Sequence, residues 1–229
     1  IKSGALQSFQ KDITENMRAV LVDWLVDVHL KFKLKPETLF LAVNIIDRYL
    51  EKAAVVKKKL QLVGISSLFI AAKYEEIYPP PLKEFVHVTD RAYTRDELLD
   101  LEGKIISALK FKFTVPSSLF FFERFGRIAK LSEKGMMMGR FILESGLINL
   151  KIMRHNPSLL ASSAVAIAEK TESNGSSPKG SLTDDARVGD VMAELIEVVK
   201  SVEKQSLNAV KKKYGGPKFL EVSKSVVRL

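Results

Sequence analysis

Residues 62–75 read LVGISSLFIAAKYE, and residues 159–172, 97 positions later, read LLASSAVAIAEKTE. Six of the fourteen aligned pairs are identical, and small residues stand opposite small residues, as in Gly64 with Ala161. Both stretches are apolar or small almost all round, which is typical of a helix buried among other helices. They suggest two copies of one helical fold, although helical sequences also match by chance and the repeat alone leaves this open.

Helical periodicity continues on both sides of these stretches, and strand-like alternation is scarce. We therefore expect an all-α protein of roughly ten helices. The pair Val115–Pro116 predicts the junction between two domains, because a residue before proline is disfavoured in a helix. The expected helices are 16–32, 36–50, 60–76, 94–109, 116–130, 133–152, 157–171, 184–202 and 206–214.

The helix expected at 16–32 carries two apolar stripes on nearly opposite sides. A surface helix needs one stripe, so this helix is either central or keeps one face for a partner. The first stripe holds Met17, Val20, Leu21, Trp24 and Val28, and the second holds Ala19, Val22, Val26 and Leu30.

Composition excludes several classes of function. The chain has 229 residues, 46% of them apolar and 28% charged, no cysteine and three histidines far apart. Disulfides, thiolate catalysis and cysteine-ligated metals are excluded, and no cofactor is expected. Phosphate-cradling glycine loops and a Gly-x-Ser-x-Gly elbow are absent, so catalysis is not expected. The longest uncharged run, 155–168, has 14 residues, too few for a membrane span of ~20.

The net charge is +9, but residues 204–229 alone hold seven Lys or Arg and one Glu. The basic surplus therefore belongs mostly to the C-terminal end, and nucleic-acid binding is not expected. Lys57–Lys59 and Lys211–Lys213 are expected to be solvated, with phosphate attraction or nuclear import as the alternative. Gly135 and Gly139 indicate close helix packing.

The motifs together resemble the cyclin family. Residues 17–25 (MRAVLVDWL), 41–50 (LAVNIIDRYL) and 71–80 (AAKYEEIYPP) look like three helices of a cyclin box. Residues 208–214 (NAVKKKY) are similar to the end of B-type, mitotic members. The resemblance implies an all-α fold of two tandem five-helix cyclin boxes with short terminal helices. The expected division is an N-terminal helix or extension at 1–15, boxes at 16–114 and 115–214, and a basic tail at 215–229.

The resemblance also implies a function. A cyclin has no active site, and instead binds and activates a cyclin-dependent kinase by favouring the active arrangement of the kinase. We expect a heterodimer with such a kinase, recruitment of substrates at G2/M, and a location in nucleus and cytoplasm. The chain lacks a starting Met, so we expect a fragment whose degradation signal lies upstream.

The family's kinase-contacting residues fall on one edge of the first box. By resemblance, Lys73 and Glu102 hydrogen-bond the kinase near its αC helix, and Phe111 packs in the same interface. Tyr74, Glu76 and Ile77 lie on that edge too.

A second implied site is the family's hydrophobic docking patch for Arg-x-Leu segments of substrates and inhibitors. Asp27 would attract the arginine, although the family more often has Glu or a neutral residue there. Arg18 and Asp47 match a structural ion pair. The patch residues are Met17, Val20, Leu21, Trp24, Leu60 and Gln61.

Two other classes remain as alternatives. A transcription factor of the TFIIB kind uses the same fold to bind DNA and polymerase, but lacks the combination of Lys73, Glu102 and the first stripe. The other alternative is an all-α hydrolase, but the sequence shows no catalytic residues for such an enzyme.

Overall fold

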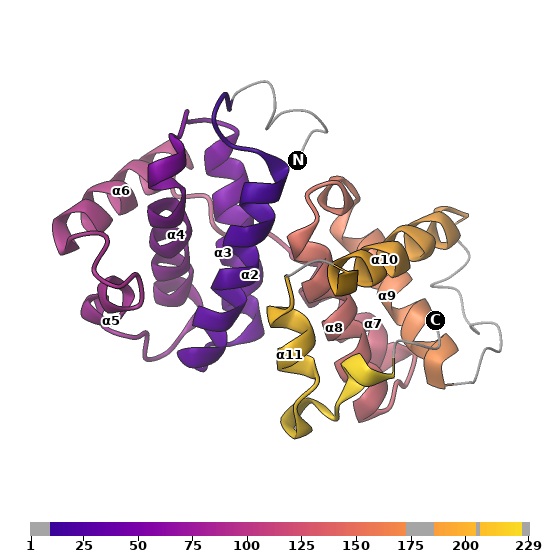
Figure 1. The fold of residues 1–229 in the computed structure, drawn as a ribbon. Helices are drawn as coiled ribbons and strands as arrows, with labels where there is room; N and C mark the ends of the chain where they lie inside the picture. Colours follow the sequence, from indigo (N-terminus) through magenta and orange to yellow (C-terminus); the bar gives the residue numbers. More distant parts are fainter. Residues whose placement is uncertain (1–9, 173–185, 205–206, 226–229) are drawn as a thin grey trace. The chain divides into compact units, whose positions relative to one another are not determined.

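The computed structural model describes residues 10–172, 186–204 and 207–225, which form helices, turns and irregular segments without a strand. The chain divides into two compact units, Ile1–Val115 and Pro116–Leu229 (Figure 1). Each unit has five α-helices among its described residues. The all-α prediction with two five-helix repeats is confirmed.

The first unit is built around α4 (Leu60–Glu75), which packs against α2 (Glu15–Lys31), α3 (Pro36–Leu50) and α6 (Arg95–Ala108). Its residues from Leu60 to Ala72 are buried apart from Gln61. Small residues allow this central position, because a methyl group added at Gly64 would collide with Leu21 of α2. A short helix α5 (Leu82–His87) and a 3-10 turn η1 (Lys57–Lys59) complete the unit.

Local capping fixes where these helices begin. Thr14 accepts a hydrogen bond from the Met17 amide at 3.2 Å and starts α2. Thr94 and Glu97 form a capping box at the start of α6, since each side chain accepts a hydrogen bond from the backbone amide of the other residue.

The second unit repeats this plan around α9 (Pro157–Glu172). Helix α9 packs against α7 (Ser118–Ile128), α8 (Glu133–Ile148) and α10 (Arg187–Lys204). The unit also holds α11 (Ala209–Tyr214) and the 3-10 turns η2 (Ile152–Arg154), η4 (Pro217–Phe219) and η5 (Val222–Lys224). A methyl group at Gly139 would collide with the Phe122 ring, so the predicted close helix packing is confirmed.

Several elements differ from the sequence-based expectation. Helix α5 was not expected, and α8 ends at Ile148 instead of residue 152. The predicted tail at 215–229 is not an appendage in its described part. Val222 is fully buried, and the Ser223 hydroxyl donates to the Lys211 carbonyl at 2.9 Å. Asp184, expected to begin a helix, lies outside the described residues.

Within the described ranges, no helix is long and apolar enough to cross a membrane. The same ranges contain no group of three or more His, Asp or Glu side chains that could hold a metal ion.

Candidate protein interface

Lys73 and Glu102 lie together at one end of the α4–α6 contact. The Lys73 ammonium forms an ion pair with Glu102 Oε1 and sits 4.2 Å from the centroid of the Phe69 ring. The Glu102 side chain is 10% exposed, while that of Lys73 is 42% exposed. An ammonium group has three donors. Lys73 can therefore remain paired with Glu102 and still donate to a partner's carbonyl group.

Large apolar side chains are exposed at the end of α4 and on the loops that follow α4 and α6. Phe111 is 76% exposed, on a residue with a left-handed backbone (φ 57°), and Ile77 is 78% exposed. Tyr74 is half exposed, and its hydroxyl hydrogen-bonds Thr114 Oγ1 at 2.5 Å. Several exposed apolar side chains of this size are typical of a protein interaction site.

Glu76 differs from its predicted neighbours because its carboxylate is already bonded within the unit. Glu76 Oε1 accepts from the Lys35 amide at 2.7 Å and from the Thr38 hydroxyl at 2.5 Å. Its side chain therefore ties the end of α4 to the start of α3. Nothing in the sequence alone indicates that this carboxylate caps another helix.

The residues of the predicted docking patch lie on α2 and at the start of α4, and their exposure differs. Val20 is 51% exposed and Asp27 is exposed, whereas Leu21 and Leu60 are buried at 5% and 6%. Met17, Trp24 and Gln61 are partly exposed. Leu21 and Leu60 thus form the base of this surface.

The expectation of two separate stripes on this helix is wrong in part. Leu30 of the second stripe is exposed at 39%, and Leu25, which belongs to neither stripe, is fully buried. Helix α2 packs on both α3 and α4. One continuous buried sector, which includes Arg18, therefore replaces the two stripes.

Arg18 and Asp47 form a buried bidentate ion pair between α2 and α3. Arg18 Nε donates to Asp47 Oδ1 at 2.6 Å, and Nη2 donates to Oδ2 at 2.7 Å. Their side chains are 0% and 1% exposed. Two parallel charge-assisted bonds fix the relative geometry of these two helices.

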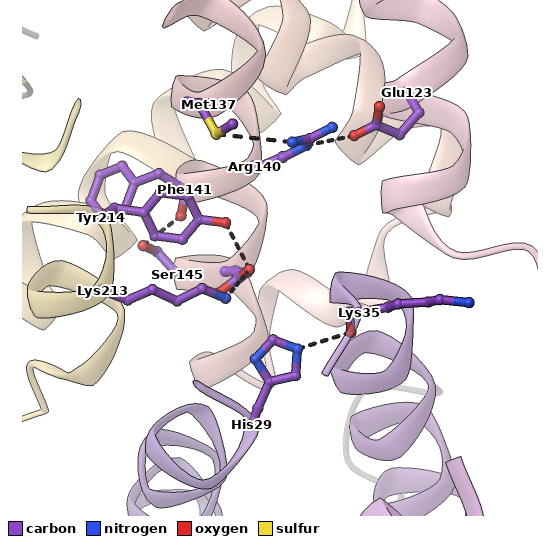
Figure 2. Close-up of polar contacts among 10 residues, drawn as sticks. His29, Lys35, Glu123, Met137, Arg140, Phe141, Ser145, Lys213 and Tyr214 are labelled. Atoms are coloured by element: carbon purple, nitrogen blue, oxygen red, sulfur yellow. Dashed lines mark hydrogen bonds and ion pairs between the residues drawn. The ribbon is translucent and has the colours of Figure 1, made fainter. Parts of the chain in front are cut away.

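A second buried ionic cluster was not found from the sequence. In the second unit, Lys213 Nζ donates to both oxygens of Glu144 at 2.7 Å, and the Tyr214 hydroxyl donates to Glu144 Oε1 at 2.7 Å (Figure 2). Burial, and secondarily the Glu144 charge, raise the pKa of Tyr214 well above its ordinary value. The prediction of a solvated Lys211–Lys213 run is wrong for Lys213. The available signal was Glu144 itself, a lone acid in the apolar run 141–148.

Two tandem five-helix units with exposed apolar residues and a partly exposed ion pair define a class of helical binding scaffolds. Comparison with protein families makes the class specific. Residues 2–114 match the model "Cyclin, N-terminal domain", and residues 116–228 match "Cyclin, C-terminal domain". The chain belongs to the cyclin family, and its curated relatives are B-type cyclins.

Among these relatives, "Cyclin-B2-1" of Oryza sativa subsp. japonica is 46% identical over 162 residues, which are 71% of this chain and 39% of the relative. "G2/mitotic-specific cyclin-B" of Dictyostelium discoideum is 38% identical over 221 residues, or 93% of this chain and 50% of the relative. The chain thus spans about half the length of the relatives it matches, or less.

Solved structures agree on the fold. A viral cyclin from herpesvirus saimiri superposes with a TM-score of 0.73 at 22% identity, over 89% of this chain and 90% of the other. A chain of the yeast RNA Pol II CTD kinase CTDK-1 complex superposes with a TM-score of 0.72 at 16% identity, over 90% of this chain and 73% of that one.

Proposed function

We propose that this chain is a non-catalytic regulatory subunit that binds and activates a cyclin-dependent protein kinase. The observation that carries the proposal is the Lys73–Glu102 pair with Phe111 and Ile77 exposed on the same helices and loops. The relatives named as G2/mitotic-specific cyclins support a role in mitosis. Presence in nucleus and cytoplasm stays a prediction.

The geometry suggests how the contact would work. Phe111 and Ile77 would be buried against the kinase, and each such burial contributes roughly 1.5–3 kcal/mol. Lys73, held by Glu102, would donate to a backbone carbonyl of the kinase and so fix its orientation. Because the surface fits one arrangement of the kinase better than another, binding would shift the kinase population towards that arrangement.

Substrate recruitment is the finer part of the proposal. The docking patch would accept the apolar side chain of an Arg-x-Leu segment between Val20 and Trp24, above buried Leu21. Exposed Asp27 supplies a carboxylate for the arginine. A short apolar peptide bound there would hold the substrate near the kinase and raise its local concentration.

The test is activation of a purified monomeric cyclin-dependent kinase on a substrate that lacks a docking segment. Lys73→Ala/Glu102→Ala removes both charges at once, so neither is left buried without the other. We expect affinity for the kinase to fall about 10- to 100-fold, as for loss of charge-assisted hydrogen bonds.

Asp100→Ala/Lys104→Ala is the matched control. Asp100 and Lys104 also form an ion pair at 2.6 Å, exposed on α6, and each lies two positions from Glu102 and therefore on another face of the helix. This variant should activate the kinase as the wild type does. Failure of the folded wild-type chain to activate any of several such kinases would refute the proposal.

A further inference from the structure

The end of α4 and the start of α3 exchange hydrogen bonds in both directions. Glu76 Oε1 accepts from the Lys35 amide and the Thr38 hydroxyl, while Lys35 Nζ donates to the Glu75 carbonyl at 2.9 Å. A carboxylate at a helix N-terminus and an ammonium group at a helix C-terminus both complement the helix dipole. We call these contacts among Lys35, Thr38, Glu75 and Glu76 the α3–α4 clip.

The clip is anchored on its other side as well. His29, buried in α2, donates through Nε2 to the Lys35 carbonyl at 2.9 Å, as Figure 2 shows. The backbone of Lys35 is therefore held through both its amide and its carbonyl group. This arrangement gives the end of α4 a fixed attachment point in the first unit.

The second unit contains an equivalent contact. Glu172, at the end of α9, accepts from the Ser132 amide at 3.2 Å and from the Ser132 hydroxyl, and Ser132 caps α8. Ser132 follows Lys35 by 97 positions, which is the spacing of the internal repeat, whereas Glu172 follows Glu76 by 96 positions and matches Glu75 in the repeat. A glutamate at the end of the central helix therefore caps the preceding long helix in both units. In both units the glutamate therefore stabilises the fold and does not form part of a recognition surface.

In the first unit the clip is followed by exposed apolar residues. Ile77 is 78% exposed and Tyr78 is 92% exposed, and Pro79–Pro81 then lead into α5. Proline fixes φ and limits the conformations available to this connection. Ordering a free loop costs about 1–2 kcal/mol per residue. A segment that is pinned at both ends avoids much of this cost when a partner covers it.

We propose that Glu76 is a positioning residue that acts through the clip to hold Ile77 and Tyr78 in place for the kinase, and is not itself a contact residue. This inference rests on the proposed function. On this proposal the Glu76 carboxylate forms its bonds within the cyclin unit, and the side chains of Ile77 and Tyr78 supply the binding energy.

The experiment measures affinity for the cyclin-dependent kinase for variants on each side of the clip. Thr38 is fully buried, so Thr38→Val removes a hydrogen bond from Glu76 without changing a side chain that a partner could touch. We expect affinity to fall about threefold for Thr38→Val and about tenfold for Glu76→Ala, which loses both acceptor contacts. Glu76→Gln keeps an acceptor oxygen and should bind better than Glu76→Ala.

Thr89→Val is the matched control, because the buried Thr89 hydroxyl donates to the Val86 carbonyl at 2.8 Å outside the clip. This variant should bind the kinase as the wild type does. In an Ile77→Ala/Tyr78→Ala background, Thr38→Val and Glu76→Ala should have no further effect on affinity. Amide hydrogen exchange of the free chain should speed up in both clip variants at Glu76, whose amide donates to the Ala72 carbonyl at 3.0 Å.

Each other result overturns the proposal in a distinguishable way. If Glu76→Ala still weakens binding in the Ile77→Ala/Tyr78→Ala background, Glu76 is a contact residue. If both clip variants bind as the wild type does while Lys73→Ala/Glu102→Ala does not, the positioning role is wrong and the proposed function stands. If the wild type binds no such kinase, both fall together.

Discussion

Each of the two cyclin domains has a buried acid at the same position of the repeat. In the first domain its cationic partner comes from near the N-terminus of the chain, and in the second from near the C-terminus. Asp47 of α3 and Glu144 of α8 are 97 positions apart, and both are buried. Asp47 pairs with Arg18 of the preceding helix α2, whereas Glu144 pairs with Lys213 of the C-terminal helix α11.

The reason for the difference lies in where the first helix of each domain begins. The position 97 residues after Arg18 is Val115, which precedes the start of α7 at Ser118. Helix α7 thus has no residue at that point to reach the acid. The C-terminal segment supplies the cation, and so the second domain is complete only with α11 in place.

Removing the acid should produce the largest effect in the first domain. Asp47→Ala leaves the Arg18 guanidinium buried without this carboxylate, and we expect a loss of about 3–5 kcal/mol in the free energy of unfolding. Glu144→Ala should cost less, because a lysine can lose its proton when buried and an arginine cannot. Denaturant unfolding at neutral pH measures both losses.

Hydrogen exchange identifies which domain is affected. Asp47→Ala should weaken protection in α2 and α3, and Glu144→Ala in α8 and α11. Arg18→Met/Asp47→Leu serves as the control, since replacing both partners of a buried ion pair by apolar residues restores much of the stability. A loss below about 1 kcal/mol for Asp47→Ala would show that the pair contributes no more than an exposed one.

Most of the fold could be predicted because its strongest signals are local. The all-round apolar helices α4 and α9, the Thr94–Glu97 capping box and Val115–Pro116 each lie within a few residues of sequence. Helix α5 could not, because six residues are too few for a periodic pattern to stand out.

The contacts that the predicted site residues make within the chain could not be predicted from the sequence. Resemblance indicated Lys73, Glu102 and Glu76, yet their bonding depends on partners far along the chain: Glu102 for Lys73, and Thr38 for Glu76. Lys213 was misjudged for the same reason. A run of three lysines is normally solvated, and its counter-charge is 69 residues away.

Helix packing offers a second contrast between the domains. Gly64 of α4 faces the flexible end of Leu21, whereas Gly139 of α8 faces the buried ring of Phe122. A rigid ring cannot yield to an added methyl group as a leucine end can. We expect Gly139→Ala to lower the free energy of unfolding by about 1–3 kcal/mol, and Gly64→Ala to lower it less.

Gly103 is the control for helix propensity, because a methyl group there would meet nothing within 4 Å. Gly103→Ala should raise the free energy of unfolding by about 0.5–1 kcal/mol. Thermal or denaturant unfolding of the three variants tests the order. Equal losses for Gly64→Ala and Gly139→Ala would mean that the two contacts are equally adaptable.

The smallest expected effect is a pH dependence of stability that Tyr214 gives to the second domain alone. Glu144 has a tyrosine partner, and loss of that hydrogen bond in Tyr214→Phe should cost about 1 kcal/mol at pH 7. The pKa of Tyr214 is raised in the folded chain by burial and by the Glu144 charge. The unfolded chain therefore ionises this phenol first, from about pH 10 upward, and the wild type loses stability there.

The Tyr214→Phe variant has no phenol at this position and does not lose that stability. The difference in free energy of unfolding between wild type and variant should therefore narrow above about pH 10. Tyr49 and Tyr93, whose pKa values burial also raises, are present in both chains and cancel. Denaturant unfolding at pH 7, 9 and 10.5 measures the gap, and a constant gap would show that the fold does not hold this phenol neutral.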